Sequence, residues 1–189
     1  MRKFILLITV LLGITFNTNA QENTSLTQHL KFMGISVDGP INKFQQKLEI
    51  RGFTLMENQE SNCKLYNGTF FNEKAMILAY YTPETKFVYR AKACIVKEDE
   101  DKIIYLYYRI KEELHKKYNN DFLEISSLEG FEACRIYVTQ PGNPDKYLGR
   151  IALYITKVNN VYSTSYLLHV DYYDLINETE NHKSNINDL

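Results

Sequence analysis

Two long segments of the chain alternate between apolar and polar residues, and this period of two constrains the fold more than any other feature. In residues 86–97 the residues Phe87, Tyr89, Ala91, Ala93 and Ile95 share one face. In residues 162–172 the shared face holds Tyr162, Thr164, Tyr166, Leu168, Val170 and Tyr172. Successive side chains of a strand point to opposite faces, so both segments are predicted to be strands with one buried face. The opposite faces carry Arg90, Lys92, Ser163, Ser165, His169 and Asp171.

Two other segments have the three- and four-residue spacing of helices. The first spans about three turns, with Asn42 as the expected N-cap, Phe44 and Leu48 on one face, and Gly52 just past the end. The second begins at the acidic run Glu98–Asp101, which suits the positive end of a helix. Its apolar residues are Ile103, Tyr107, Ile110, Leu114 and Tyr118.

Further strands are expected at residues 53–55, 63–71, 75–81, 131–139 and 150–158. A helix followed by several strands occurs twice along the chain. The sequence therefore predicts an α+β domain, in which an antiparallel sheet has two helices packed on one face. A tandem helix-plus-three-strand repeat, with halves at 35–97 and 98–173, is one interpretation. Short matches favour it, Cys63–Tyr66 with Cys134–Tyr137 and Ala79–Thr82 with Leu153–Thr156. Convergent strand composition is the alternative.

The N-terminus has the layout of a secretory signal peptide. Arg2 and Lys3 precede the apolar stretch Phe4–Phe16, and small residues lead to an expected cut after Ala20. The apolar stretch is shorter than the ~20 residues that span a bilayer, which disfavours an uncleaved anchor. We expect a signal peptide at 1–20, one domain at 21–173 and a polar tail at 174–189. No transmembrane segment is expected after cleavage.

The three cysteines, Cys63, Cys94 and Cys134, permit at most one internal disulfide. No C-x-x-C is present, which argues against a redox or zinc module. We favour buried thiols acting as small hydrophobes, and a structural disulfide stays open as the alternative.

Composition excludes several classes of function. The chain is 44% hydrophobic and 24% charged, which is typical of a globular protein. Lys and Arg total 22 against 23 Asp and Glu, so the chain has no excess of positive charge with which to bind nucleic acid. No nucleotide-binding glycine motif and no H-E-x-x-H occurs, so we expect no cofactor and no metal. The high content of Asn, Ile, Lys and Tyr, together with the signal peptide, indicates a bacterial envelope protein.

The segment Phe32–Ile41, followed by Phe44–Phe53, resembles the opening of small, uncharacterised exported proteins of Bacteroidetes-type bacteria. The resemblance covers about 25 residues and implies a location in the periplasm or at the cell surface. It implies no catalytic residues. The repeated helix-plus-strands order also looks like that of small periplasmic modules of the BLIP and BamE kind, which bind other proteins.

His169 and Asp171 form the one arrangement that could support catalysis, because Asp171 could orient the imidazole from the same strand face. Ser165 lies about 13 Å away along the strand, too far to be the nucleophile. A surface polar pair is therefore the favoured interpretation, and a hydrolase centred on His169 and Asp171 is the alternative.

Pairs of adjacent tyrosines are the remaining feature that could indicate a binding surface. One member of each pair should point away from the core, and tyrosine is favoured in binding surfaces. The predicted binding residues are Tyr81, Tyr108, His169, Asp171 and Tyr173. We expect an exported, non-catalytic module that binds an unidentified protein or envelope component. A structural subunit of an envelope assembly is a third possibility.

Overall fold

The computed structural model describes residues 28–57, 60–118 and 123–177, so the predicted signal peptide and its cleavage site lie outside the described residues. The helices are α1 (Ile41–Ile50) and α2 (Glu100–Tyr118), and one helical turn follows at 175–177. The strands of the first half are β1 (Lys31–Phe32), β2 (Ile35–Ser36), β3 (Thr54–Met56), β4 (Cys63–Phe70), β5 (Glu73–Tyr81) and β6 (Val88–Lys97). Those of the second half are β7 (Leu123–Leu128), β8 (Phe131–Gln140), β9 (Asn143–Asn159) and β10 (Thr164–Asp174).

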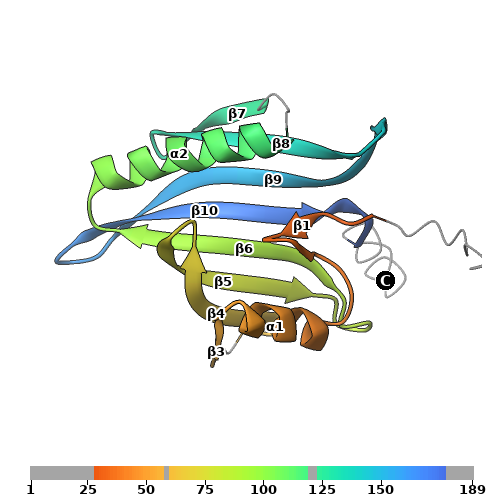
Figure 1. Cartoon of the computed structure of the whole chain (residues 1–189). Coiled ribbons are helices and arrows are strands. Elements are labelled where there is room, and N and C mark those ends of the chain that lie inside the picture. Colours follow the sequence, from red (N-terminus) through yellow and green to blue (C-terminus); the bar gives the residue numbers. More distant parts are fainter. Residues whose placement is uncertain (1–27, 58–59, 119–122, 178–189) are drawn as a thin grey trace, which may run out of the picture.

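Eight strands form one antiparallel sheet in the order β3-β4-β5-β6-β10-β9-β8-β7. Both helices lie on the same face of this sheet, with the short β1–β2 hairpin between them (Figure 1). Helix α2 packs against β6, β9 and β10, and α1 packs against β2 and β3. The predicted α+β class with an antiparallel sheet is therefore confirmed.

The two halves have the same order of elements, but each is a helix followed by four strands rather than three. Strand β7 was not predicted, because apolar and polar residues alternate only over its first four positions, Leu123 to Ser126. The halves join through the antiparallel pair β6 and β10 at the centre of the sheet.

Strand register agrees with one of the two proposed sequence matches and contradicts the other. Ala79 and Leu153 both face the helices, and the following residues, Tyr80 and Tyr154, both face away. The match of Cys63–Tyr66 with Cys134–Tyr137 is out of register by one residue. Tyr66 is buried under the helices, whereas Tyr137 pairs with Arg150 on the opposite face. A slip of one residue exchanges the faces of a strand, so this match is not a structural equivalence.

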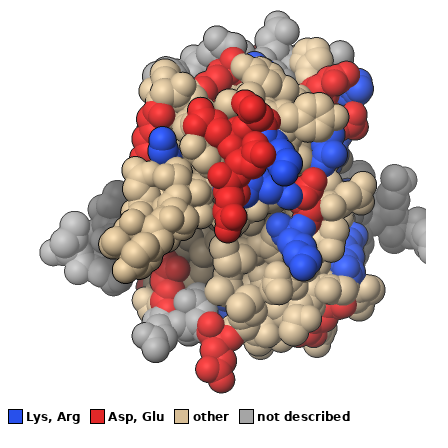
Figure 2. Space-filling model, turned by 90° about the vertical axis from the view of Figure 1, so that its left-hand side faces the viewer, with Lys and Arg blue, Asp and Glu red and all other residues tan. Residues whose placement is uncertain are grey.

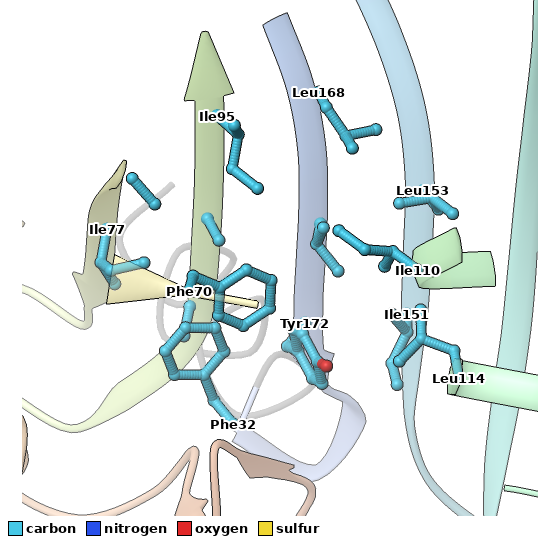
Figure 3. Close-up of a cluster of buried hydrophobic side chains, with 14 of the residues drawn as sticks. Phe32, Phe70, Ile77, Ile95, Ile110, Leu114, Ile151, Leu153, Leu168 and Tyr172 are labelled. Atoms are coloured by element: carbon cyan, nitrogen blue, oxygen red, sulfur yellow. The ribbon is translucent and has the colours of Figure 1, made fainter. Parts of the chain in front are cut away.

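The core lies between the helices and the sheet (Figure 3). Leu168 is completely buried there, and Phe32 stacks on Phe70 with 5.4 Å between ring centroids. The predicted alternation is confirmed for the central positions, Ala91, Ala93, Ile95, Tyr166, Leu168, Val170 and Tyr172. It is wrong at both outer ends, since Phe87 is 38% and Tyr162 is 97% exposed. Each precedes the first residue of its strand, where the alternation no longer applies.

The helix boundaries were predicted in part. Pro40 is the N-cap of α1 and Asn42 lies inside the helix, where its Oδ1 accepts a hydrogen bond from Lys64 Nζ. Gly52 has a φ of +84°, which suits glycine just beyond a helix end, as predicted. At the start of α2 the Oδ1 of Asp99 accepts a hydrogen bond from the backbone N–H of Lys102 at 3.0 Å.

Ordered packing continues past residue 173, the predicted end of the domain. Asp174 is fully buried and its Oδ2 accepts hydrogen bonds from the Leu30 backbone N–H and His29 Nδ1. Asn177 is also buried and donates to the Val88 carbonyl at 3.1 Å. These contacts hold the segment before β1 against the end of β10. The rest of the predicted tail lies outside the described residues.

Candidate binding surface on the open face of the sheet

We call the face of the sheet opposite the helices the open face. Strand register places on it Tyr80 of β5, Arg90, Lys92 and Cys94 of β6, His169, Asp171 and Tyr173 of β10, Arg150, Ala152, Tyr154 and Thr156 of β9, and Arg135 and Tyr137 of β8. Most of these side chains are partly exposed, whereas those on the helix side are almost completely buried.

An ion pair lies at the centre of the open face. The Nε and Nη2 atoms of Arg90 donate to the two carboxylate oxygens of Asp171 at 2.9 and 2.7 Å. The guanidinium carbon lies 4.5 Å from the ring centroid of Tyr80 and 4.6 Å from that of Tyr173. Two-point hydrogen bonding and aromatic stacking fix both the plane and the position of the guanidinium.

His169 makes a separate set of contacts beside this ion pair. Its Nδ1 lies 3.2 Å from Cys94 Sγ and its Nε2 lies 2.8 Å from Thr156 Oγ1. The imidazole stacks on the Tyr154 ring at a centroid distance of 4.7 Å. Burial, reinforced by the charges of Lys92 and Arg90, lowers the pKa of His169 to about 3, so the ring is neutral at neutral pH.

These contacts differ from the predicted His169–Asp171 arrangement in two ways. Asp171 binds Arg90 and not the imidazole, because an arginine on the neighbouring strand offers it two donors. Neither residue is on the surface, since His169 is 6% and Asp171 is 1% exposed beneath the surrounding rings. The expectation of a surface polar pair was therefore wrong.

The pairing of Cys94 with His169 does not make an activated nucleophile. Burial raises the pKa of the Cys94 thiol, whereas a catalytic cysteine needs a lowered one. The low pKa of His169 likewise opposes formation of an imidazolium-thiolate pair. All three cysteines are buried on strands.

Next to the ion pair the open face contains a hollow of about 260 Å³. Ala152 lies between Arg135 on β8 and Asp171 on β10, and its small side chain leaves the space open. Arg150, Tyr154 and Tyr173 also line the hollow. The Arg150 guanidinium carbon is 4.4 Å from the centroid of the Tyr173 ring.

The structure brings together three of the five predicted binding residues, His169, Asp171 and Tyr173. Tyr81 packs toward the helix side, and its neighbour Tyr80 is the member of that pair on the open face. Tyr108 lies on α2, on the other side of the sheet, and is 52% exposed.

Sequence analysis did not assign a binding role to several residues of the open face, Tyr80, Arg90, Lys92, Arg135, Arg150 and Tyr154. Their shared face can be derived from the sequence only once the pairing of β5, β6, β10, β9 and β8 is known.

The end of the molecule where α2 begins has a different surface. Figure 2 shows acidic and basic side chains close together there. They surround a hollow of about 410 Å³ lined by Glu73, Lys97, Asp99, Asp101, Lys102 and Arg109. The Nζ of Lys97 lies 2.7 Å from Glu73 Oε2. The positive and negative charges that line this hollow largely cancel, in contrast to those on the open face.

Within residues 28–57, 60–118 and 123–177, no three histidine, cysteine or acidic side chains are placed to hold a metal ion together. No helix in the same described ranges combines the length and the apolar character needed to cross a membrane.

No model of a known protein family matches the chain, and no curated protein or solved structure matches it.

Proposed function

We propose that the protein is an exported, non-catalytic module of a bacterial envelope that binds another macromolecule on the open face of its sheet. The observation that carries the proposal is the Arg90–Asp171 pair, held between Tyr80 and Tyr173 on the face of the sheet opposite α1 and α2. Arginine and tyrosine are the residues most enriched at the energetic centres of protein interfaces.

The fixed geometry of this cluster also favours binding. Side chains that are already ordered lose less conformational entropy when a partner docks. Cross-strand stacking and the two-point ion pair order Arg90, Tyr80 and Tyr173 before any partner arrives.

Site-specific photo-crosslinking tests the proposal. A benzophenone amino acid replaces Val158, which is 41% exposed on the open face, or Tyr105, which is 69% exposed on α2. Irradiation of the native envelope should give a discrete crosslinked product from position 158 and none from position 105. A product from position 105 alone, or from neither position, contradicts the assignment of the open face.

The charge-reversal variant Lys92→Glu gives an independent test, because Lys92 lies on the open face 5.5 Å from the Tyr154 ring centroid. Lys43→Glu, at an exposed position of α1, is the matched control. We expect the crosslink from position 158 to disappear with Lys92→Glu and to persist with Lys43→Glu.

The hydrolase alternative makes the opposite prediction. A hydrolytic activity of the purified protein that disappears in both His169→Gln and Asp171→Asn, with both variants folded, would overturn the binding proposal.

Export is tested separately: mass spectrometry of the exported product should find Gln21 at its N-terminus, and a product that retains Met1 contradicts cleavage.

A further inference from the structure

We infer that the hollow around Ala152 is the binding site for a carboxylate side chain of an acidic segment in the protein partner. This inference rests on the proposed function and specifies the chemistry of the partner. Around the Arg90–Asp171 ion pair and the hollow, the open face carries the cations Arg90, Lys92, Arg135 and Arg150 beside the carboxylate of Asp171.

The charged residues that line the hollow are two arginines, Arg135 and Arg150, and one carboxylate, Asp171. The chain as a whole has a formal net charge of −1, so a cationic face is not a consequence of overall composition. The Asp171 carboxylate accepts two hydrogen bonds from Arg90, and the other charged side chains of the lining are Arg135 and Arg150. An acidic partner is the one whose charge complements this surface.

Arg135 is suited to meet an acceptor. Its Nη1 lies 3.3 Å from the Tyr137 hydroxyl, and its buried Nε has no hydrogen-bond partner within the described part of the chain. A buried donor without a partner costs free energy. A small rotation of the guanidinium toward an incoming carboxylate provides that partner.

The aromatic walls favour a peptide over a free anion. Tyr154 and Tyr173 line the hollow, and tyrosine rings provide large, rigid contact area. An acidic side chain flanked by apolar residues would use both the cations and the rings. A small inorganic anion would use only the cations.

Peptide selection tests the inference. The full exported chain is used to select from a phage-displayed random peptide library, with Ala152→Leu as the counter-selection bait. Leucine at this position fills the hollow without removing a charge. The selected peptides should carry Asp or Glu next to apolar residues. No enrichment, or enrichment that Ala152→Leu does not remove, overturns the inference.

Synthetic versions of a selected peptide identify the ligand chemistry. Replacing its acidic residue by the matching amide should weaken binding at least about tenfold, as expected for hydrogen bonds to a charged group. Arg135→Gln should weaken binding similarly, and Lys43→Gln should not change it. Binding of the acidic peptide should also fall as salt is raised.

Two outcomes point to other ligands and overturn the inference. One is tighter binding of a phosphoserine version of the peptide than of the carboxylate version. The other is binding of anionic phosphatidylglycerol vesicles that Arg135→Gln abolishes while the acidic peptide does not bind. Circular dichroism melts of Ala152→Leu and Arg135→Gln confirm that each variant is folded.

The two proposals can fail separately. A crosslink from position 158 that persists with both Ala152→Leu and Arg135→Gln supports the open face as a binding surface and refutes the hollow as a carboxylate-binding site. Absence of a crosslink from position 158 in the benzophenone-labelled chain that carries no other substitution refutes the proposed function itself.

Discussion

Replacing His169 by glutamine should make folding less sensitive to acid. In the native protein the imidazole is buried and its pKa is about 3, whereas in the unfolded chain it titrates near 6.5. Between these values the unfolded state binds a proton that the native state does not. The native state is therefore fully stabilised above pH 6.5 and loses stability as the pH falls toward 3.

The size of the effect follows from the two pKa values. Each pH unit within this window costs about 1.4 kcal/mol, so lowering the pH from 7.5 to 5 costs roughly 2 kcal/mol through His169 alone. His169→Gln removes this contribution and leaves the other titrating groups in place. The free energy of unfolding of wild type should thus fall about 2 kcal/mol further than that of the variant over this interval.

Urea unfolding at pH 7.5, 6, 5 and 4, monitored by circular dichroism, measures the difference. Thr156→Val is the matched control, because it removes the hydroxyl 2.8 Å from Nε2 but keeps the imidazole. Its curve should be offset from wild type at pH 7.5 and keep the wild-type pH dependence. Parallel curves for wild type and His169→Gln would show that His169 is not buried in its neutral form. Nitrogen chemical shifts of a neutral ring at pH 5 provide an independent check.

Three further predictions concern the stability of the sheet, two of them with a control substitution. Leu168→Ala should lower the free energy of unfolding by about 2–5 kcal/mol, since Leu168 is completely buried, whereas Ser165→Ala should change it by about 0.5 kcal/mol or less; equal effects in urea would mean that the register of β10 is wrong. Asp171→Asn should cost about 1.5–3 kcal/mol by weakening the charge-assisted bonds to Arg90, while Lys116→Ala, which removes an exposed ion pair on α2, should leave the free energy of unfolding nearly unchanged in the same assay. Gly149→Ala should destabilise by about 1–3 kcal/mol, because its Cβ would lie 2.3 Å from the Tyr173 carbonyl oxygen, and an unchanged thermal midpoint would contradict that close approach.

The sequence predicted those parts of the fold that depend on neighbours along the chain. Alternation identified the buried face at Ala91, Ala93 and Leu168, and helical spacing identified Ile103 and Ile110. These patterns are local, because one buried surface determines the residue type at every second or at every third to fourth position. Strand β7 was missed because its alternation of apolar and polar residues is only four residues long, from Leu123 to Ser126, which is too short a pattern to identify a strand at the edge of the sheet.

The candidate site depends on contacts between distant segments, and local patterns do not contain them. Arg90 and Asp171 are 81 residues apart, and Cys94 and His169 are 75 apart. Sequence analysis placed Arg90 and Asp171 among the polar faces of two separate strands. Only the pairing of β6 with β10 shows that these two polar faces are one surface.

The position of β10 at the centre of the sheet affects the order in which the sheet can form. β10 is the last strand of the sheet in chain order, yet it pairs with both β6 and β9. Until it is made, β6 and β9 each present an unpaired edge, and such edges pair readily with other chains. The two four-stranded halves therefore cannot close into one sheet before residue 164 is available. A chain truncated before that point should aggregate, and a chaperone that covers the edge of β6 should improve the yield of full-length protein.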